Sequence, residues 1–399
     1  MSRISSHFLA STLAICIGTG IAAAQSTSST DTASNTAAAS TPAAYVYVSS
    51  QPTTGTEHIY GYAAAQDGKL TPVPGSPLTS SLVGPLALNG KWLFGSVNLG
   101  GSDETGQYAI DSYRIAANGS LQHADTYSGT APYSEEPQNL FLDHTGASLY
   151  TGLAISDYTS GYGSFSIDQT NGKITPVNYV GANIGVGALT FIGNNRFAYS
   201  VTCFRGPDIL GYQRKTDGAL SELQLPQTGP APPPDDFLYC PLAAAADPTN
   251  HVVMSLEPQA TTGPNLDPSQ LAVYTADEDG NLSTTSTYEN MPTTQAEPDQ
   301  LAMSTGGAFL AAAGSATNNA PGNGLQVFRM HGADPLTVFS GVLIPDIYAQ
   351  GLFWDKYDHL YLLGTSKLYV FSVTESGVKQ APGSPYSIPS PSGLIVLPK

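Results

Sequence analysis

One phrase recurs seven times along the chain and constrains the fold more than any other feature of the sequence. Each copy has aromatic or apolar residues at alternate positions, then a polar turn, and then Leu, Ile or another apolar residue. Alternation with a period of two predicts a β-strand, and the turn with the segment after it predicts a hairpin. The copies occupy residues 60–73, 111–124, 163–177, 210–223, 271–285, 325–339 and 368–382.

The spacing of the copies fits the four-stranded blade of a β-propeller. Their turn glycines are Gly68, Gly119, Gly172, Gly218, Gly280 and Gly377, and the sixth copy has Asp334-Pro335 before its Leu336. Where adjacent, these glycines lie about 46 to 62 residues apart, which is the size of one blade. A second hairpin precedes the copies, as at residues 139–154, 188–202, 301–314 and 352–364. It supplies strands A and B of a blade, and the recurring phrase supplies strands C and D.

The two ends of the repeat region complement each other. Only one strand, residues 44–50, precedes the first copy, whereas residues 391–398 form a spare strand after the last. Pairing of these two strands would close the ring and leave no open sheet edge. The sequence therefore predicts an all-β fold, a seven-bladed β-propeller over residues 44–399, closed by pairing of the N- and C-terminal strands in the first blade.

The residues before the propeller are interpreted as a processing signal and a linker. Arg3, an apolar run over residues 8–21 and small residues before Gln25 indicate a signal peptide at residues 1–24. Residues 25–43 contain no large apolar side chain and predict a disordered low-complexity linker. The mature chain is then secreted or periplasmic. In that oxidising compartment its two remaining cysteines, Cys203 and Cys240, predict a disulfide.

The charge balance limits the partners. The chain has 14 Lys and Arg against 31 Asp and Glu, a formal charge of −17. This leaves too few cations to neutralise phosphates, so we expect no nucleic-acid and no membrane partner. Loops that precede strands A and C carry most of the acids, including Asp103, Glu104, Asp157, Asp346 and Asp236, with Arg205 as the evident cation. We call the face that holds these loops the mouth face; the turns on the other face carry Lys.

Two similar tracts lie near the two ends of the propeller segment, GKLTPVPGSP (68–77) and VKQAPGSP (378–385). Together with the recurring Tyr-x-Tyr or Val-Phe phrase before a Gly-x-Leu turn, they resemble the lactonase family of seven-bladed propellers, which includes 6-phosphogluconolactonase. The likeness covers nearly all of the chain from residue 44. It implies Arg and His with acidic residues at the channel mouth, where strand A begins with a Pro-Arg-His-like pattern. This chain has Pro137-Gln138-Asn139-Leu140 and Pro298-Asp299-Gln300-Leu301 there, so the Arg/His pattern is not matched.

The residues at the starts of the A strands are the candidate ligand-binding site: Gln138, Asn139, Asp299, Gln300 and Gln350. Amides are poor acids and bases but hydrogen-bond in both directions, which suits sugar hydroxyls or backbone amides. Alternatively, they only satisfy channel waters and blade-to-blade backbone groups. Asp299 is the one carboxylate we would assign to catalysis if there is any. The histidines of the turns, His144, His251, His331 and His359, are expected to be exposed on the opposite face.

No cofactor and no metal are expected. The chain lacks a Gly-x-Ser-x-Gly elbow and a His-Glu-x-x-His motif, and the acidic turn at residues 277–280 lacks the spacing of an EF-hand loop. Two functions remain. The first is a monomeric binding module that takes a protein or a neutral carbohydrate ligand at its acidic mouth face. The second is a lactone hydrolase related to 6-phosphogluconolactonase, with altered active-site residues.

Overall fold

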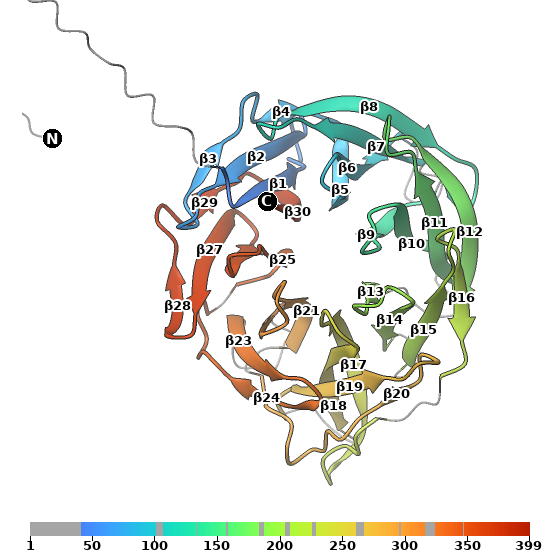
Figure 1. Cartoon of the computed structure of the whole chain (residues 1–399), viewed down its shortest axis with the longest axis vertical. Helices are drawn as coiled ribbons and strands as arrows, with labels where there is room; N and C mark the ends of the chain where they lie inside the picture. The colour runs from blue at the N-terminus through green and yellow to red at the C-terminus, as the bar shows by residue number, and fades with distance from the viewer. Residues whose placement is uncertain are drawn as a thin grey trace, which may run out of the picture. The chain divides into compact units, whose positions relative to one another are not determined.

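The folded unit spans Ser40–Lys399 and consists of antiparallel sheets around a central axis (Figure 1). The computed structural model describes residues 41–100, 107–133, 135–156, 159–182, 187–203, 208–225, 229–260, 267–294, 297–315, 324–345 and 347–399. The predicted signal peptide and nearly all of the predicted linker lie outside these residues. No helix within these ranges is long and apolar enough to cross a membrane.

Seven sheets surround the axis, which confirms the seven-bladed propeller. Each is one blade, and its strands run in chain order from the axis outward except in the first blade (Figure 1). The first blade contains β30 (Pro391–Pro398), β1 (Ala44–Ser50), β2 (His58–Ala64), β3 (Leu70–Pro72) and β4 (Leu78–Thr79). Blade 2 contains β5 (Leu82–Leu88), β6 (Trp92–Asn98), β7 (Tyr108–Ile115) and β8 (Leu121–Ser128). Blade 3 contains β9 (Pro137–Leu142), β10 (Ser148–Ser156), β11 (Thr159–Ile167) and β12 (Ile174–Ala182).

The other four blades follow the same order. Blade 4 contains β13 (Thr190–Phe191), β14 (Phe197–Thr202), β15 (Asp208–Arg214) and β16 (Leu220–Leu223). Blade 5 contains β17 (Asp236–Ala246), β18 (His251–Ala260), β19 (Gln270–Ala276) and β20 (Leu282–Ser283). Blade 6 contains β21 (Glu297–Met303), β22 (Phe309–Ser315), β23 (Gly324–His331) and β24 (Asp334–Val338). Blade 7 contains β25 (Gly351–Trp354), β26 (His359–Leu363), β27 (Lys367–Thr374), β28 (Gly377–Gln380) and β29 (Tyr386–Ser387).

The chain ends close the ring as the sequence predicts. In the first blade the order is β3-β2-β1-β30, so the C-terminal strand β30 is the innermost and pairs antiparallel with β1. The register runs from Ala44 opposite Pro398 to Ser50 opposite Pro391, with one irregularity near Ser50. Blade 1 is therefore built from both ends of the propeller segment, and β1 is paired on both sides, with β2 and with β30.

The glycine of the recurring phrase is explained by packing between blades. Gly119 ends the β7–β8 turn with φ of 81°, and a Cβ atom on it would lie 2.5 Å from the Tyr45 ring of blade 1. Its carbonyl accepts a hydrogen bond of 2.8 Å from the Tyr47 hydroxyl. Tyr199 of blade 4 donates to Gly280 of blade 5 in the same way, also at 2.8 Å. The recurring glycine thus lets the turn of one blade pack against a tyrosine of the neighbouring blade. Only Gly combines a positive φ with so short a distance between the turn backbone and the ring.

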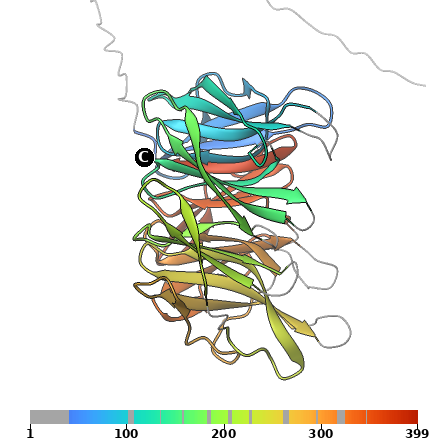
Figure 2. The ribbon, with the colours of Figure 1, turned by 90° about the vertical axis from the view of Figure 1, so that its right-hand side faces the viewer.

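Apolar and ionic contacts fill the space between blades. Trp92 and Phe94 of blade 2 share a core cluster with Leu149 and Phe165 of blade 3. The Arg214 guanidinium of blade 4 forms an ion pair with the buried Asp143 carboxylate in the β9–β10 turn of blade 3. The core is thus a set of layers between adjacent sheets, and Figure 2 shows the ring of sheets from the side.

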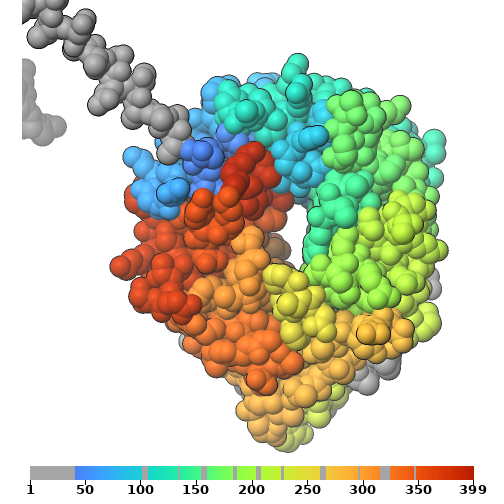
Figure 3. Space-filling view, viewed as in Figure 1, coloured from blue at the N-terminus to red at the C-terminus, as the bar shows by residue number. Residues whose placement is uncertain are grey.

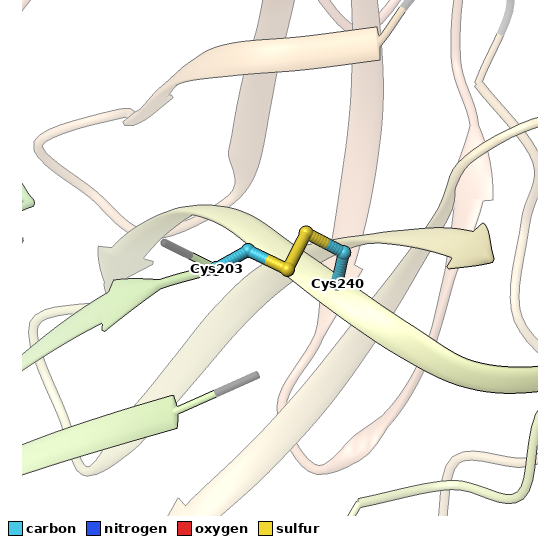
Figure 4. Close-up of a disulfide and its surroundings, with 2 residues drawn as sticks. All are labelled: Cys203 and Cys240. Atoms are coloured by element: carbon cyan, nitrogen blue, oxygen red, sulfur yellow. A yellow bond between two sulfur atoms is a disulfide. The ribbon is translucent and has the colours of Figure 1, made fainter. Parts of the chain in front are cut away.

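The predicted disulfide is confirmed. Cys203 directly follows β14 of blade 4, and Cys240 lies within β17 of blade 5 (Figure 4). Their Cα atoms are 5.5 Å apart, and the two residues are 37 positions apart in the sequence. The bond therefore ties blade 4 to the start of the innermost strand of blade 5, across the proline-rich connection.

Candidate ligand-binding site

The innermost strands begin on one face of the ring, around the open centre that Figure 3 shows. Because the blades are antiparallel and similarly connected, their first strands run in the same direction and present their first residues at the mouth face. The predicted site residues occupy these positions on β9 of blade 3, on β21 of blade 6 and directly before β25 of blade 7. Figure 1 shows β21 and β25 side by side, with β9 across the ring from them. The structure therefore brings Asp299, Gln300 and Gln350 onto adjacent blades, and places Gln138 and Asn139 opposite.

A β-bulge stands at each of the two polar pairs. In blade 3, Asn139 lies opposite Gly152 but Pro137 lies opposite Leu153, which leaves Gln138 out of the register. In blade 6, Glu297 lies opposite Ser315 and Gln300 opposite Ala313, so the irregularity includes Asp299. Gln138 and Asp299 are exposed, while Asn139 and Gln300 are half-buried. Bulges re-aim side chains at the edges of sheets and near functional sites, and these two expose polar groups at the mouth.

Hydroxyl groups fix the backbone at the mouth. Ser255 of blade 5 donates a hydrogen bond of 2.7 Å to the carbonyl of Pro298, the residue before Asp299. Ser49 of blade 1 donates to the Gly84 carbonyl of β5 at 3.1 Å. Tyr162 of blade 3 donates at 2.9 Å to the Gly187 carbonyl, which precedes β13. In each case one blade anchors the start of the next innermost strand, so these strand starts are held in place before any ligand arrives.

Gln350 serves a structural role with part of its side chain. The side-chain amide is oriented with Nε2 towards two backbone carbonyls. Nε2 donates to the Pro391 carbonyl of blade 1 at 2.9 Å and to the Gly364 carbonyl at 3.2 Å. Its backbone N–H donates to the Leu363 carbonyl at 2.7 Å. The amide nitrogen thus bonds blade 7 to blade 1, and the Oε1 atom is the part of this side chain that can accept from a ligand.

Apart from Asp236, the first residue of β17, the remaining innermost strands offer small or apolar groups at the mouth. A Cβ atom on Gly187 would lie 2.3 Å from the Val201 carbonyl oxygen, so no side chain fits there. Ser392 donates to the hydroxyl of Ser49 at 3.0 Å, and Leu242 is half-buried. Polar side chains therefore line two arcs of the mouth, blade 3 and blades 6 to 7, rather than a full ring.

The innermost strands contain no Lys, Arg or His, and all of their residues are described. Their charged residues are Asp236, Glu297 and Asp299. An Arg fork or a Lys is the usual partner of a phosphate in proteins, because it supplies both the charge and several donors. These strands provide acceptors and amide donors instead. Among the loop charges predicted for this face, Asp103, Glu104, Asp157, Arg205 and Asp346 lie outside the described residues.

Two histidines, His359 and His251, are less exposed than the sequence predicts. His359 lies in the β25–β26 region on the face opposite the mouth, as predicted, but it is buried rather than exposed. Its Nδ1 atom lies 2.8 Å from Oδ2 of the fully buried Asp355, which also accepts from the Tyr361 hydroxyl at 2.9 Å. The reason is packing from the next blade, because a Cβ on Gly68 of blade 1 would lie 3.2 Å from the His359 ring.

The other turn histidines keep to the predicted face. His144 and His331 are exposed as predicted, whereas His251 is half-buried rather than exposed, with Nδ1 at 2.8 Å from Asp247 Oδ2. Burial alone would raise the pKa of Asp247, but hydrogen bonds from Thr249 and His251 outweigh it and hold that pKa below its usual range. These histidines support turns and have no place on the innermost strands.

The acidic turn at residues 277–280 closes on itself. Asp277 Oδ1 accepts from the backbone N–H groups of Asp279 and Asn281, both at 2.9 Å. Hydrogen bonds from the side chain and backbone of Asn281 lower the pKa of Asp277 below its ordinary value. Among the residues that the structure describes, no group of three or more His, Cys, Asp or Glu side chains is arranged to hold a metal ion.

Comparison with known proteins supports the lactonase type of propeller at the level of fold. No family model matches the chain, and no curated protein matches it in sequence. A candidate 6-phosphogluconolactonase from Bacteroides uniformis superposes with a TM-score of 0.65 at 11% identity, covering 89% of this chain and 99% of that one. A second candidate from Bacteroides fragilis gives 0.63 at 11% identity, covering 89% and 98%. PpgL, a periplasmic gluconolactonase from Pseudomonas aeruginosa, gives 0.62 at 16% identity, covering 89% and 99%.

Proposed function

We propose that this chain is a lactonase-like propeller that binds a neutral, hydroxyl-rich ligand of the carbohydrate type at its mouth face. The observation that carries the proposal is the make-up of the innermost strands, which hold amides at the mouth and no Lys, Arg or His. Amide groups donate and accept hydrogen bonds, as sugar hydroxyls do, so each can pair with a hydroxyl in either sense. The anchored strand starts support the proposal, because a preformed site loses less entropy on binding.

Charge argues against a phosphorylated ligand. Glu297 and Asp299 belong to one innermost strand, and Glu135 and Glu136 directly precede another. A phosphate dianion approaching these carboxylates would be repelled, and the innermost strands offer no cation to compensate. A neutral sugar or sugar lactone would meet no such barrier.

The test is calorimetric titration with neutral oligosaccharides such as maltotriose and cellotriose, and with gluconate 6-phosphate as the charged comparison. We expect the double variant Gln138→Ala/Asn139→Ala to weaken binding of the neutral ligand at least fivefold. Gln122→Ala, an exposed glutamine on the outer strand β8, is the matched control and should bind normally. Equal loss in both variants, or tighter binding of the phosphate, would contradict the proposal.

Lactone hydrolysis is the second candidate, and the fold similarity to a periplasmic gluconolactonase favours it. Gluconolactone carries no phosphate, so it fits the acidic mouth as well as a neutral sugar does. Asp299 would be the general base that activates water, because it is the exposed carboxylate among the five candidate residues. Hydrolysis of glucono-1,5-lactone that is above background and lost in Asp299→Asn would establish this function instead.

We further propose an extracytoplasmic location. The Cys203–Cys240 bond supports it, because structural disulfides persist in oxidising compartments. Expression of the full chain followed by cell fractionation tests the location. Recovery of only the reduced protein in the cytoplasm would contradict it.

A further inference from the structure

A second recess lies between blades 4 and 5, and none of the five candidate mouth residues lines it. Its volume is about 230 Å³. Its walls come from β15, from the connection that follows β16, and from β17, β18 and β19. The residues that matter for its chemistry are Ile209, Pro230, Pro232, Phe237, Tyr239 and Tyr274. We call this recess the blade-5 groove.

The blade-5 groove is apolar and partly open to solvent. Phe237 on its wall is 58% exposed, the largest value among the large apolar side chains that the structure describes. Pro230 and Pro232 are half-buried, and Tyr239 and Tyr274 are buried beneath them. An exposed aromatic ring beside an apolar recess of prolines and tyrosines is typical of a contact surface, because its burial by a partner is favourable.

Acidic groups gather at one end of the groove. Asp236 directly precedes the lining residue Phe237, and Glu289 directly follows Tyr288, whose carbonyl accepts from the same Gln270 side chain that Tyr239 contacts. Burial first, and then the charges of Tyr288, Asp236, Asp267 and Glu289, raise the pKa of Tyr239. Burial also raises the pKa of Asp236, and the charge of Asp267 raises it further. No Lys or Arg is among the groove's described lining residues. A cation placed at this end would relieve the repulsion between the carboxylates.

The groove wall is held in place by covalent and hydrogen bonds. Cys240, which forms the disulfide, stands between the lining residues Tyr239 and Pro241. The Tyr239 hydroxyl donates to Gln270, whose amide nitrogen donates to the Tyr288 carbonyl at 2.9 Å and to the Met291 carbonyl at 3.2 Å. A partner would therefore meet a preformed recess rather than one that must be ordered on binding.

We propose that the blade-5 groove docks a peptide segment of a partner protein in which Lys or Arg adjoins an aromatic or aliphatic side chain. The recess has room for about one large apolar side chain of the peptide, and the exposed ring of Phe237 packs against that side chain at the rim of the recess. The carboxylates of Asp236, Asp267 and Glu289 take the neighbouring cation. This interaction uses none of the five candidate ligand-binding residues, and of the acids on the mouth face it shares Asp236, so Phe237→Ser separates it from the proposed carbohydrate binding.

The experiment is a selection of random twelve-residue peptides displayed on phage, with the full folded chain as bait and the variant Phe237→Ser for counter-selection. Selected peptides are then synthesised and titrated by fluorescence anisotropy. Phe237 is more than half exposed, so its replacement leaves the core intact; thermal unfolding verifies this. Val338→Ser, which changes a 54% exposed residue on the outer strand of blade 6, is the matched control.

We expect the selected peptides to pair a basic residue with an apolar one. Their dissociation constants should rise at least tenfold for Phe237→Ser and for Asp236→Asn/Asp267→Asn, stay unchanged for Val338→Ser, and rise with salt. The proposal is overturned if no peptide is enriched, if the enriched peptides lack basic residues, or if Phe237→Ser binds them equally well. It is also overturned if phenethylammonium alone saturates the groove while no peptide binds, since the occupant would then be a small cation.

Discussion

Removal of the last strand should unfold the propeller, because β30 completes two interblade layers at once. Truncation after Ser390 deletes Leu394 and Val396, which belong to the core between blades 7 and 1, and Leu397, which belongs to the core between blades 1 and 2. These three side chains are at most 7% exposed. Full burial of each contributes about 1.5–3 kcal/mol, so their loss removes about 5–9 kcal/mol. A typical domain has a free energy of unfolding of only about 5–15 kcal/mol.

The truncated chain should therefore lose its cooperative thermal transition and aggregate through the exposed edge of β1. Circular dichroism on heating and size-exclusion chromatography measure both effects. A synthetic peptide of residues 391–399 should restore the transition, and the same peptide with Leu394→Asp and Val396→Asp should not. A truncated chain that unfolds at the temperature of the full chain, or equal rescue by both peptides, would refute the reasoning that ring closure supplies this stability.

Three more predictions concern stability. Cys203→Ser/Cys240→Ser should lower the free energy of unfolding by about 3–4 kcal/mol in denaturant titrations, because the bond closes a loop between residues 37 positions apart; no change would mean that the loop is ordered without it. Gly119→Ala should cost about 2–4 kcal/mol but Gly75→Ala only about 1–2, since both have positive φ but only Gly119 faces a crowded ring; equal costs would contradict the packing argument. The pKa of Asp247 is lower in the folded than in the unfolded chain, so this carboxylate adds to the free energy of unfolding above about pH 4 and stops doing so as the pH falls through the folded pKa. Asp247→Asn should therefore weaken the pH dependence of the free energy of unfolding on the acid side, and an unchanged pH dependence would contradict this.

The fold could be predicted because its determinants are local in sequence. Alternating apolar residues and a glycine turn specify one hairpin, and the hairpin repeats at the spacing of a blade. The pairing of β1 with β30 followed from counting strands at the two ends. The disulfide followed from the two cysteines that remain after the predicted signal peptide, because an oxidising compartment was expected for the chain. None of these inferences required knowledge of which residues face each other across the ring.

The details that sequence missed depend on contacts between distant segments. His359 is buried because the turn that contains Gly68 covers it, and nothing near His359 in the sequence announces that contact. The bulges at Gln138 and Asp299 depend on the register of neighbouring strands, although Pro137 and Pro298 directly before them were a usable signal of strand irregularity. The approach of Asp236 to Asp267 likewise follows from the folding of blade 5.

The contacts that close the ring are also the contacts that position the mouth. Gln350 bonds blade 7 to Pro391 of blade 1, and Ser255 bonds blade 5 to Pro298, one residue before Asp299. A shift of one blade against the next would therefore move the polar groups at the mouth, which makes the site sensitive to substitutions that touch no ligand. Conversely, a ligand that bridges blade 3 and blades 6 to 7 would resist such shifts, and its binding should raise the stability of the whole ring by mass action. The candidate site and the closure of the ring are thus coupled through the same backbone carbonyls, and the site gains its rigidity from side chains that bond one blade to the next.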